Sequence, residues 1–116
     1  MSKFLTRIFV VEDNEFFSQL IKQKLEMNDK KEVTLFHNGE DFQRNLYLNP
    51  DIVVLDYNLP NTTGIDLLKE IKNFNEEIKT ILLSGQEKVD VVIEAFENGA
   101  EEYIKKFEEI FRVANI

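Results

Sequence analysis

The sequence contains no cysteine and a single histidine, His37, and each scarcity excludes a class of functional site. Without cysteine, disulfide bonds and thiolate metal sites are excluded. One histidine cannot build a histidine-rich metal site or a conventional catalytic triad. The side chains left to bind a metal ion are therefore those with oxygen atoms, above all the carboxylates.

Long hydrophobic runs are also missing. The first apolar run, residues 8–11, stops at Glu12 and is too short for the core of a signal peptide. No run approaches the roughly 20 apolar residues that a membrane span needs. We therefore expect a cytoplasmic protein with no membrane partner.

Acidic residues outnumber basic ones, with 22 Asp and Glu against 14 Lys and Arg and a formal net charge of −8. Phosphates repel an acidic surface, so we expect no direct binding of nucleic acid. Such a balance can also serve only solubility, and the informative question is whether some of the carboxylates converge. The length of 116 residues suits one domain, residues 1–116, that buries its own core.

Short apolar runs alternate with amphipathic stretches along the whole chain. The runs predict strands that are buried on both faces: residues 8–11, 33–36, 52–55, 81–83 and 103–104. Helical periodicity follows each run, with Asn14, Asn38 and Thr63 as predicted N-caps and Asn98-Gly99 as a predicted helix end. The last of these stretches covers residues 107–114. Five strand–helix units predict an α/β fold with a single (βα)5 parallel sheet and helices on both faces.

Polar residues follow four of the predicted strands. Glu12 and Asp13 follow the first strand, Asp56 the third, Ser84 the fourth and Lys105 the fifth. Ligands of such sheets bind at the carboxyl ends of the strands. If the first and third strands are neighbours, three carboxylates converge, and their mutual repulsion calls for a cation. Oxygen ligands favour Mg²⁺, which shares its coordination shell with phosphate.

Beside a metal ion, Asp56 can act as a carboxylate nucleophile towards phosphorus and form an aspartyl phosphate. Positioning and charge stabilisation do most of the work in phosphoryl transfer, and Ser84 and Lys105 offer a hydroxyl and an ammonium for the phosphoryl oxygens. An Asp after a buried strand is also a common cap, and Asp13 alone could cap the first helix. The combination of four strand ends at one cleft is what favours chemistry over capping.

Together these residues make the chain resemble a response-regulator receiver domain of two-component signalling, over nearly its whole length. The resemblance rests on the following elements: Glu12-Asp13, Asp56 with Leu59-Pro60, Gly64, Ser84-Gly85, Gly99-Ala100 and Lys105. It implies a doubly wound, flavodoxin-like sheet with strand order 2-1-3-4-5. It also implies a signalling phosphoacceptor that catalyses only its own phosphorylation and dephosphorylation.

The resemblance assigns roles to the acidic residues. Asp56 would be the phosphoacceptor. The carboxylates of Asp13 and Asp56, with the backbone carbonyl of Asn58, would hold Mg²⁺. Glu12 would act through a metal-bound water.

Other residues would bind the phosphoryl group or respond to it. Ser84 would bond to that group and Lys105 would pair with it. Ser84 and Tyr103 would form the switch, because Ser84 moves towards the phosphoryl group and Tyr103 fills the vacated space. This change would reshape the surface formed by the fourth helix, fifth strand and fifth helix. Asn58 and Gln86 occupy positions that tune dephosphorylation in the family.

The chain departs from the family pattern after the lysine. The family usually has a proline there, in a cis peptide, whereas this chain reads Lys105-Lys106-Phe107. A cis bond without proline costs about 2.5–4 kcal/mol. Two outcomes stay open at this point: a trans bond with a rebuilt loop, or a strained cis bond.

The resemblance also implies partners. The phosphodonor would be a sensor histidine kinase or a histidine phosphotransfer protein, and a homodimer through the switch surface is a further candidate. Two other functions stay open: a pseudo-receiver, which is an interaction module without phosphotransfer, and an aspartate-nucleophile phosphatase. Such phosphatases usually place a second Asp two residues after the nucleophile, where this chain has Asn58.

Overall fold

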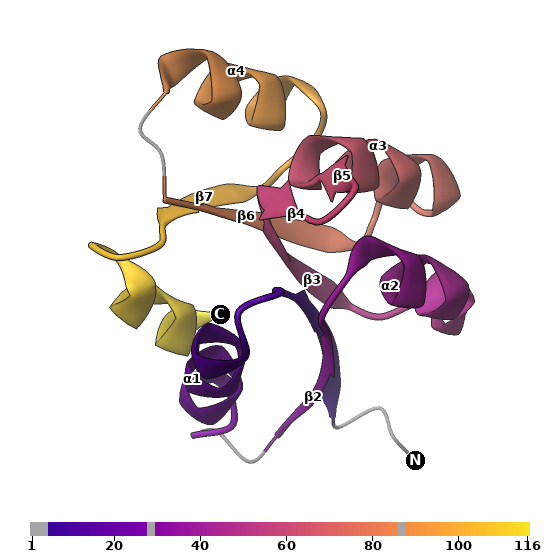
Figure 1. Cartoon of the computed structure of the whole chain (residues 1–116). Helices are drawn as coiled ribbons and strands as arrows, with labels where there is room; N and C mark the ends of the chain where they lie inside the picture. Colours follow the sequence, from indigo (N-terminus) through magenta and orange to yellow (C-terminus); the bar gives the residue numbers. More distant parts are fainter. Residues whose placement is uncertain (1–4, 28–29, 86–87) are drawn as a thin grey trace.

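The computed structural model describes residues 5–27, 30–85 and 88–116. Within these ranges, parallel strands form a five-stranded central sheet: β1 (Thr6–Val11), β2 (Lys31–Phe36), β3 (Ile52–Asp56), β6 (Lys79–Ser84) and β7 (Glu102–Lys105). Their order across the sheet is β2-β1-β3-β6-β7 (Figure 1). Counted along the chain among these five strands alone, this is the order 2-1-3-4-5. The predicted doubly wound, flavodoxin-like fold is confirmed.

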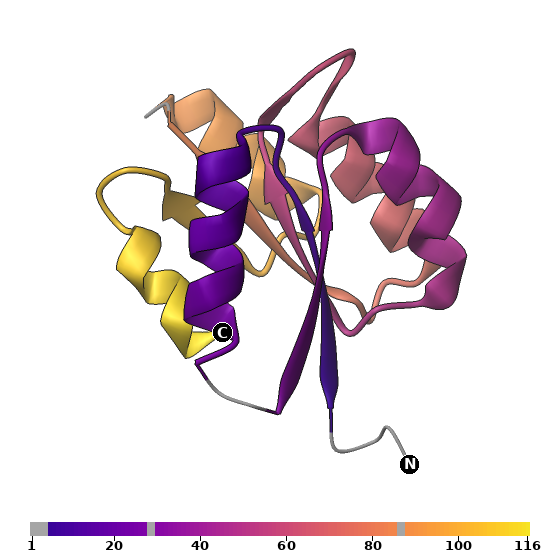
Figure 2. The ribbon, with the colours of Figure 1, turned by 60° about the horizontal axis from the view of Figure 1, so that its bottom comes forward.

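Helices cover both faces of the sheet (Figure 2). One face carries α1 (Glu15–Leu25) and a 3₁₀ helix, η3 (Ile110–Asn115). The other carries α2 (Gly39–Asn45), α3 (Gly64–Phe74) and α4 (Val89–Glu97), and a one-turn 3₁₀ helix, η2 (Leu46–Leu48), follows α2. None of the helices in the part of the chain that the structure describes has the length and hydropathy to traverse a bilayer.

Alternation along β1 divides the core into two layers. Phe9 and Val11 belong to the apolar cluster under α2, α3 and α4. Ile8 and Val10 belong to the cluster under α1 and η3. Successive side chains of a strand point to opposite faces, so a strand that is covered on both sides must be apolar throughout. The uniformly apolar runs of the sequence therefore report a sheet that is buried on both faces.

Three predicted helix starts are confirmed by side-chain hydrogen bonds. Asn14 Oδ1 accepts from the backbone N–H of Phe17 at 2.9 Å, and Asn38 Oδ1 accepts from that of Asp41 at 2.8 Å. Thr63 Oγ1 accepts from the backbone N–H of Asp66 at 3.2 Å. Each bond satisfies a donor that the first helical turn cannot use internally. The predicted end of α4 is also confirmed, because Asn98 is its C-cap and Gly99 has φ +100°.

Two local features differ from the prediction. A small antiparallel hairpin, β4 (Asn58–Leu59) and β5 (Thr62–Thr63), follows β3 directly, and two-residue strands are too short for any periodicity to announce them. The final amphipathic stretch, predicted as a helix over residues 107–114, forms the 3₁₀ helix η3, which begins only at Ile110. Its one buried side chain, Val113, packs into the cluster under α1.

Candidate functional site

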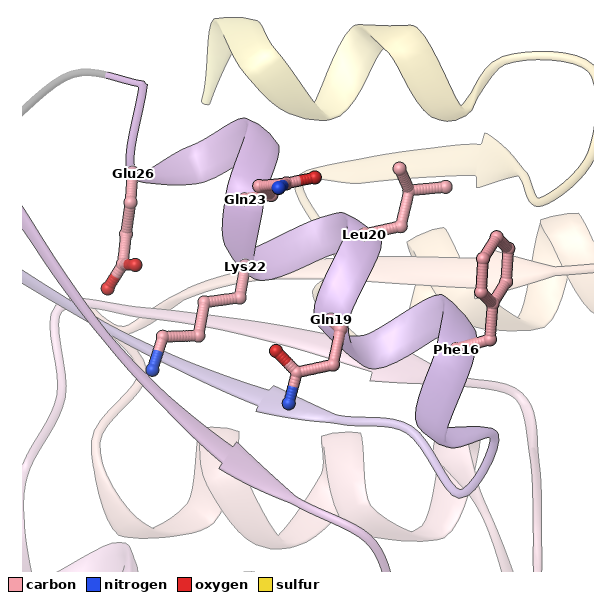
Figure 3. A pocket seen from close by; sticks show the side chains of 6 residues that line it. All are labelled: Phe16, Gln19, Leu20, Lys22, Gln23 and Glu26. Carbon is pink, nitrogen blue, oxygen red and sulfur yellow. The ribbon is translucent and has the colours of Figure 1, made fainter.

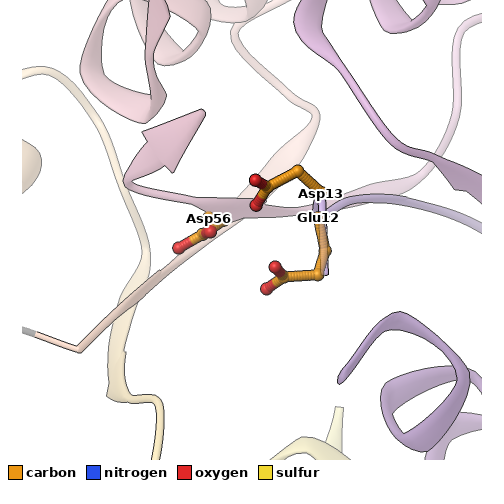
Figure 4. A group of neighbouring side chains, drawn as sticks. All are labelled: Glu12, Asp13 and Asp56. Carbon is orange, nitrogen blue, oxygen red and sulfur yellow. The ribbon is translucent and has the colours of Figure 1, made fainter. Parts of the chain in front are cut away.

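Three acidic residues that the sequence singles out lie together at the carboxyl end of the sheet. β1 and β3 are neighbours, with Val11 opposite Leu55, so the residues that follow lie side by side. One carboxylate oxygen from each of Glu12, Asp13 and Asp56 lies within 4.8 Å of the others (Figure 4). The condition under which the sequence predicted convergence, adjacent first and third strands, is therefore met.

The three carboxylates differ in their access to solvent. Glu12 is 0% exposed and Asp56 is 3% exposed, whereas Asp13 lies at the surface. The backbone N–H of Glu12 donates to Phe36 O at 2.9 Å, which continues the β1–β2 pairing by one residue and carries the Glu12 side chain into the interior. The site therefore has a buried floor and one open side.

Gly64, the first residue of α3, lets the helix begin in close contact with the backbone at the end of β3. Its N–H donates to Tyr57 O at 2.8 Å. A Cβ at this position would lie 2.6 Å from the carbonyl oxygen of Asp56 and 2.8 Å from Leu82 Cδ1, closer than atoms can pack. Glycine at position 64 is therefore required by this close approach of α3 to the end of β3.

Lys106, rather than the predicted Lys105, reaches the carboxylates. Lys106 Nζ lies 2.8 Å from Glu12 Oε1 and 3.1 Å from Asp56 Oδ2, and its side chain is 11% exposed. Lys105 Nζ instead lies 4.0 Å from Glu108 Oε2, and its side chain is 40% exposed. The assignment of Lys105 to the site is thus corrected.

The physical reason for this correction is the length of β7. The apolar run ends at residue 104, but the strand continues through Lys105, which pairs with Ser84. The N–H of Lys106 then donates to Ser84 O at 2.8 Å, so Lys106 is the first residue beyond the strand. No peptide bond in the described ranges is cis, so the bonds on both sides of Lys106 are trans. The residue that follows the site lysine, where the family usually has proline, is Phe107.

Burial dominates the electrostatics of the cluster. It raises the pKa of Glu12 to about 7, against the opposing effects of Lys106 and of the backbone N–H of Asn14, which donates to Glu12 Oε2 at 3.0 Å. Burial also raises the pKa of Asp56, although Lys106 and the N–H of Asn58 oppose the change. For Lys106 burial lowers the pKa, but contacts with Glu12 and Asp56 outweigh it, and the net direction is upward. The ammonium of Lys106 therefore stays charged. Its single positive charge does not fully offset the cost of burying the carboxylates of Glu12 and Asp56.

The donor set suits a hard divalent cation. Glu12 Oε1 is buried and, among the described residues, has no hydrogen-bond partner, because its 2.8 Å contact with Lys106 is an ion pair without hydrogen-bond geometry. Three carboxylates around an open side, with no nitrogen or sulfur ligand, match the preference of Mg²⁺ or Mn²⁺ for oxygen. The cluster can hold a metal ion. The predicted role of the Asn58 carbonyl as a further ligand stays a prediction.

The predicted switch residues lie on the neighbouring strands. Ser84 is buried at the end of β6, beside Lys105 in the sheet register. Tyr103, in β7, is half-buried and packs against the core under α4. It also lines a surface pocket with Val89 and Val92 of α4. Gln86 lies outside the described residues.

Sequence reasoning missed two aromatic residues near the cluster. Lys106 Nζ lies 4.9 Å from the ring centroid of Phe17, and the rings of Phe17 and Phe107 are 5.2 Å apart at 78°. Both residues fit the helical period of the flanking stretches, so the pattern alone assigns them to the core. Only the position of Lys106 distinguishes them.

Comparisons with known proteins agree with this geometry. The family model described as "Response regulator receiver domain" matches residues 8–114. The chemotaxis protein CheY of Bacillus subtilis (strain 168) is 33% identical over 101 residues, which cover 86% of this chain and 84% of that protein. The transcriptional regulatory protein CssR of the same organism is 34% identical over 100 residues, which cover 85% of this chain but only 44% of CssR.

Solved structures give the same result. The BeF3-activated DrrB receiver domain superposes with a TM-score of 0.88 at 29% identity, over 96% of this chain and 92% of that one. The Mn(2+)-bound form of response regulator Rcp1 superposes with a TM-score of 0.85 at 25% identity, over 96% of this chain and 91% of that one. The chain thus matches nearly all of these two domains but less than half of CssR.

Proposed function

Because the chain belongs to the family of response regulator receiver domains, which are signalling phosphoacceptors, we propose that it takes a phosphoryl group onto Asp56. The observation that carries the proposal is the juxtaposition of buried Asp56 with Glu12, Asp13 and the ammonium of Lys106. A nucleophile, oxygen ligands for a metal ion and a fixed positive charge then surround one point. We propose Mg²⁺ as the metal.

The chemistry follows from these groups. An Asp56 carboxylate oxygen attacks the phosphorus of a phosphohistidine or of a small acyl phosphate. An O–P bond forms as the bond from phosphorus to the donor breaks, and the donor leaves with the electron pair of that bond. When bound by Glu12, Asp13 and Asp56, the metal ion supplies positive charge beside the phosphoryl oxygens. Lys106 supplies a second positive charge, at hydrogen-bond distance from Asp56.

The response to phosphorylation would involve Ser84 and Tyr103. A phosphoryl group adds charge and strong acceptor oxygens at Asp56. Ser84 lies at the end of the adjoining strand β6 and carries a hydroxyl, a group that donates hydrogen bonds to phosphoryl oxygens. Tyr103 borders both the core and the α4 pocket, so a change in its packing would reach the surface of α4 and β7. The output would be a population shift between two packings.

The proposed partners are a sensor histidine kinase or a histidine phosphotransfer protein, and a second copy of the chain through α4, β7 and η3. We also propose that residues 1–116 act as one receiver domain in the cytoplasm, with no turnover beyond its own phosphorylation and dephosphorylation. A phosphatase is not favoured, because Asn58 stands where such enzymes have their second Asp. A pseudo-receiver is not favoured either, because the acidic cluster is complete.

The experiment is phosphorylation by acetyl phosphate with Mg²⁺, followed by intact-mass analysis. We expect the wild-type protein to gain one phosphoryl group and Asp56→Asn to gain none. Asp51→Asn is the matched control, since Asp51 precedes the same strand at its opposite end, where its carboxylate accepts from the N–H of Arg7. A gain that persists in Asp56→Asn, or a wild type that gains nothing while it binds Mg²⁺, would refute the proposal.

A further inference from the structure

The Lys106 ammonium must be held in place to act on Asp56. A lysine side chain is a flexible stem that carries a point charge, so it reaches many positions unless its surroundings select one. In this site Nζ lies 2.8 Å from Glu12 and 3.1 Å from Asp56, and most of the side chain is buried. Two carboxylates attract the ammonium from one side. A further contact is needed to fix the position of Nζ on the side that faces away from these carboxylates.

The ring of Phe17 lies against the Lys106 ammonium. The distance from Nζ to the ring centroid is 4.9 Å, within the range of about 6 Å over which a cation is attracted to an aromatic face. The attraction is stronger where the cation is partly removed from water, and the Lys106 side chain is only 11% exposed. Phe17 is therefore a third neighbour of this ammonium and carries no charge that would compete for the carboxylates.

Phe17 and Glu12 are held by one short segment. The N–H of Asn14 donates to Glu12 Oε2 at 3.0 Å, and Asn14 Oδ1 accepts from the N–H of Phe17 at 2.9 Å. The cap of α1 thus joins the carboxylate that attracts the ammonium to the residue whose ring faces it. The spacing between these two groups is set by local hydrogen bonds rather than by a mobile loop.

Phe107 supports the same ring from the other chain segment. Its ring meets that of Phe17 at a centroid distance of 5.2 Å and an angle of 78°, the edge-to-face geometry that aromatic pairs prefer. Because Phe107 follows Lys106 directly, this contact ties the backbone beside Lys106 to α1. A Cβ on Gly85 would lie only 3.3 Å from Phe107 Cε2, so glycine there leaves room for the ring.

We propose that Phe17 is a positioning residue, whose aromatic face, braced by Phe107, holds the Lys106 ammonium against Glu12 and Asp56. The catalytic consequence rests on the proposed function, because Lys106 then stands ready for the phosphoryl group that arrives at Asp56. The contact itself does not depend on that function. Phe17 touches no reacting atom and acts only through Lys106.

The test compares three variants. Phe17→Leu removes the aromatic face and keeps apolar bulk, and Phe17→Tyr keeps the face. Phe16→Leu is the matched control: the same change on the adjacent residue, which is 76% exposed and borders a shallow hollow on the outer side of α1 (Figure 3). The first measurement is the NMR shift of the Lys106 ε-methylene protons, identified by their loss in Lys106→Arg. The second is the rate of phosphorylation by acetyl phosphate at saturating Mg²⁺.

We expect these protons to lie upfield in wild type, Phe17→Tyr and Phe16→Leu, and to move to the ordinary lysine range in Phe17→Leu. We expect the phosphorylation rate of Phe17→Leu to fall about threefold to tenfold, the size of a partly desolvated cation–π contact. The Mg²⁺ dissociation constant should stay within about twofold, because the side chain of Phe17 has no atom that can bind the metal ion. Phe17→Tyr should keep the wild-type rate, because it retains the aromatic face. An effect of packing alone would lower the rate in both variants.

Several results would overturn the proposal. If the Lys106 signal of Phe17→Leu stays at its wild-type position, the ring does not hold the ammonium. An equal fall in rate for Phe17→Tyr and Phe17→Leu means that packing, not the aromatic face, matters. A wild type that never accepts a phosphoryl group refutes the proposed function, and the Lys106 shift then still decides whether Phe17 positions the ammonium.

Discussion

Replacing Lys106 by methionine should destabilise the protein far more than the same change at Lys105. Methionine keeps an unbranched chain of similar length and removes the charge. At position 106 this leaves Glu12 and Asp56, which are 0% and 3% exposed, without the ammonium that lies 2.8 and 3.1 Å from them. At position 105 it removes an exposed charge, whose 4.0 Å contact with Glu108 lies at the surface of the protein.

The expected magnitudes follow from this difference in burial. Removing one partner of a buried ion pair costs about 3–5 kcal/mol, because the other charge stays buried without compensation. The cost at position 106 should be smaller, since Asp13 opens the site to water and Glu12, with a pKa of about 7, can take up a proton. We expect a loss of about 2 kcal/mol in the free energy of unfolding for Lys106→Met at pH 8. An exposed pair contributes about 0–1 kcal/mol, so Lys105→Met should stay within about 0.5 kcal/mol of wild type.

The assay is urea unfolding of both variants and wild type at pH 8 and pH 5, without metal and with saturating Mg²⁺. At pH 5, below the pKa of Glu12, one carboxyl is neutral, so the loss in Lys106→Met should shrink. Saturating Mg²⁺ should also reduce it, because a bound cation replaces the missing charge. Equal losses in the two variants, or a loss in Lys106→Met that is the same at both pH values, would refute the reasoning.

Two further predictions concern Glu12 and Gly64. Burial gives Glu12 a higher pKa in the folded state than the ordinary 4.5, so the folded state holds this proton more tightly and stability falls as pH rises from about 4.5 to about 7. Glu12→Gln should remove most of that fall and raise stability at pH 8 by about 1–2 kcal/mol, read from urea unfolding without metal at a series of pH values; a pH dependence that survives unchanged would contradict the burial of Glu12 as its cause. Gly64→Ala should cost about 2–3 kcal/mol, because its Cβ would lie 2.6 Å from the backbone oxygen of Asp56. Gly39→Ala is the comparison, since its Cβ would press only on a Thr62 methyl group at 2.9 Å, and its cost in the same assay should be smaller; equal costs would mean that the approach of α3 is not tight.

The fold was predictable because its signals are local and repeated. Each strand run is apolar throughout, and each N-cap lies one residue before its helix, as Asn14 and Thr63 do. The hairpin after β3 was not predictable, because its four strand residues give no periodic signal. The 3₁₀ form of the last helix was not predictable either, since the spacing of its apolar residues suits an α-helix equally well.

The prediction of the site was right for its acidic residues and wrong for its lysine. Glu12, Asp13 and Asp56 follow strands whose ends are marked by the change from apolar to charged residues. Lys105 and Lys106 are both lysines, and no change in polarity separates the last residue of β7 from the first residue after it. The end of the strand is set by pairing with β6, through Ser84 and Lys105, which is a property of the sheet.

By itself, the sequence determined the alternation of strands and helices, the absence of thiolate ligands and the candidate carboxylates, because these depend on residue type and on spacing along the chain. Only the tertiary structure decided that β1 and β3 are neighbours, that Lys106 reaches Asp56 and that the ring of Phe17 faces its ammonium. Each of these is a contact between segments far apart in the chain, and such contacts are set by sheet order, register and packing. Lys106 lies close to Asp56 because β3, β6 and β7 pair in parallel, so that β3 and β7 end at the same side of the sheet.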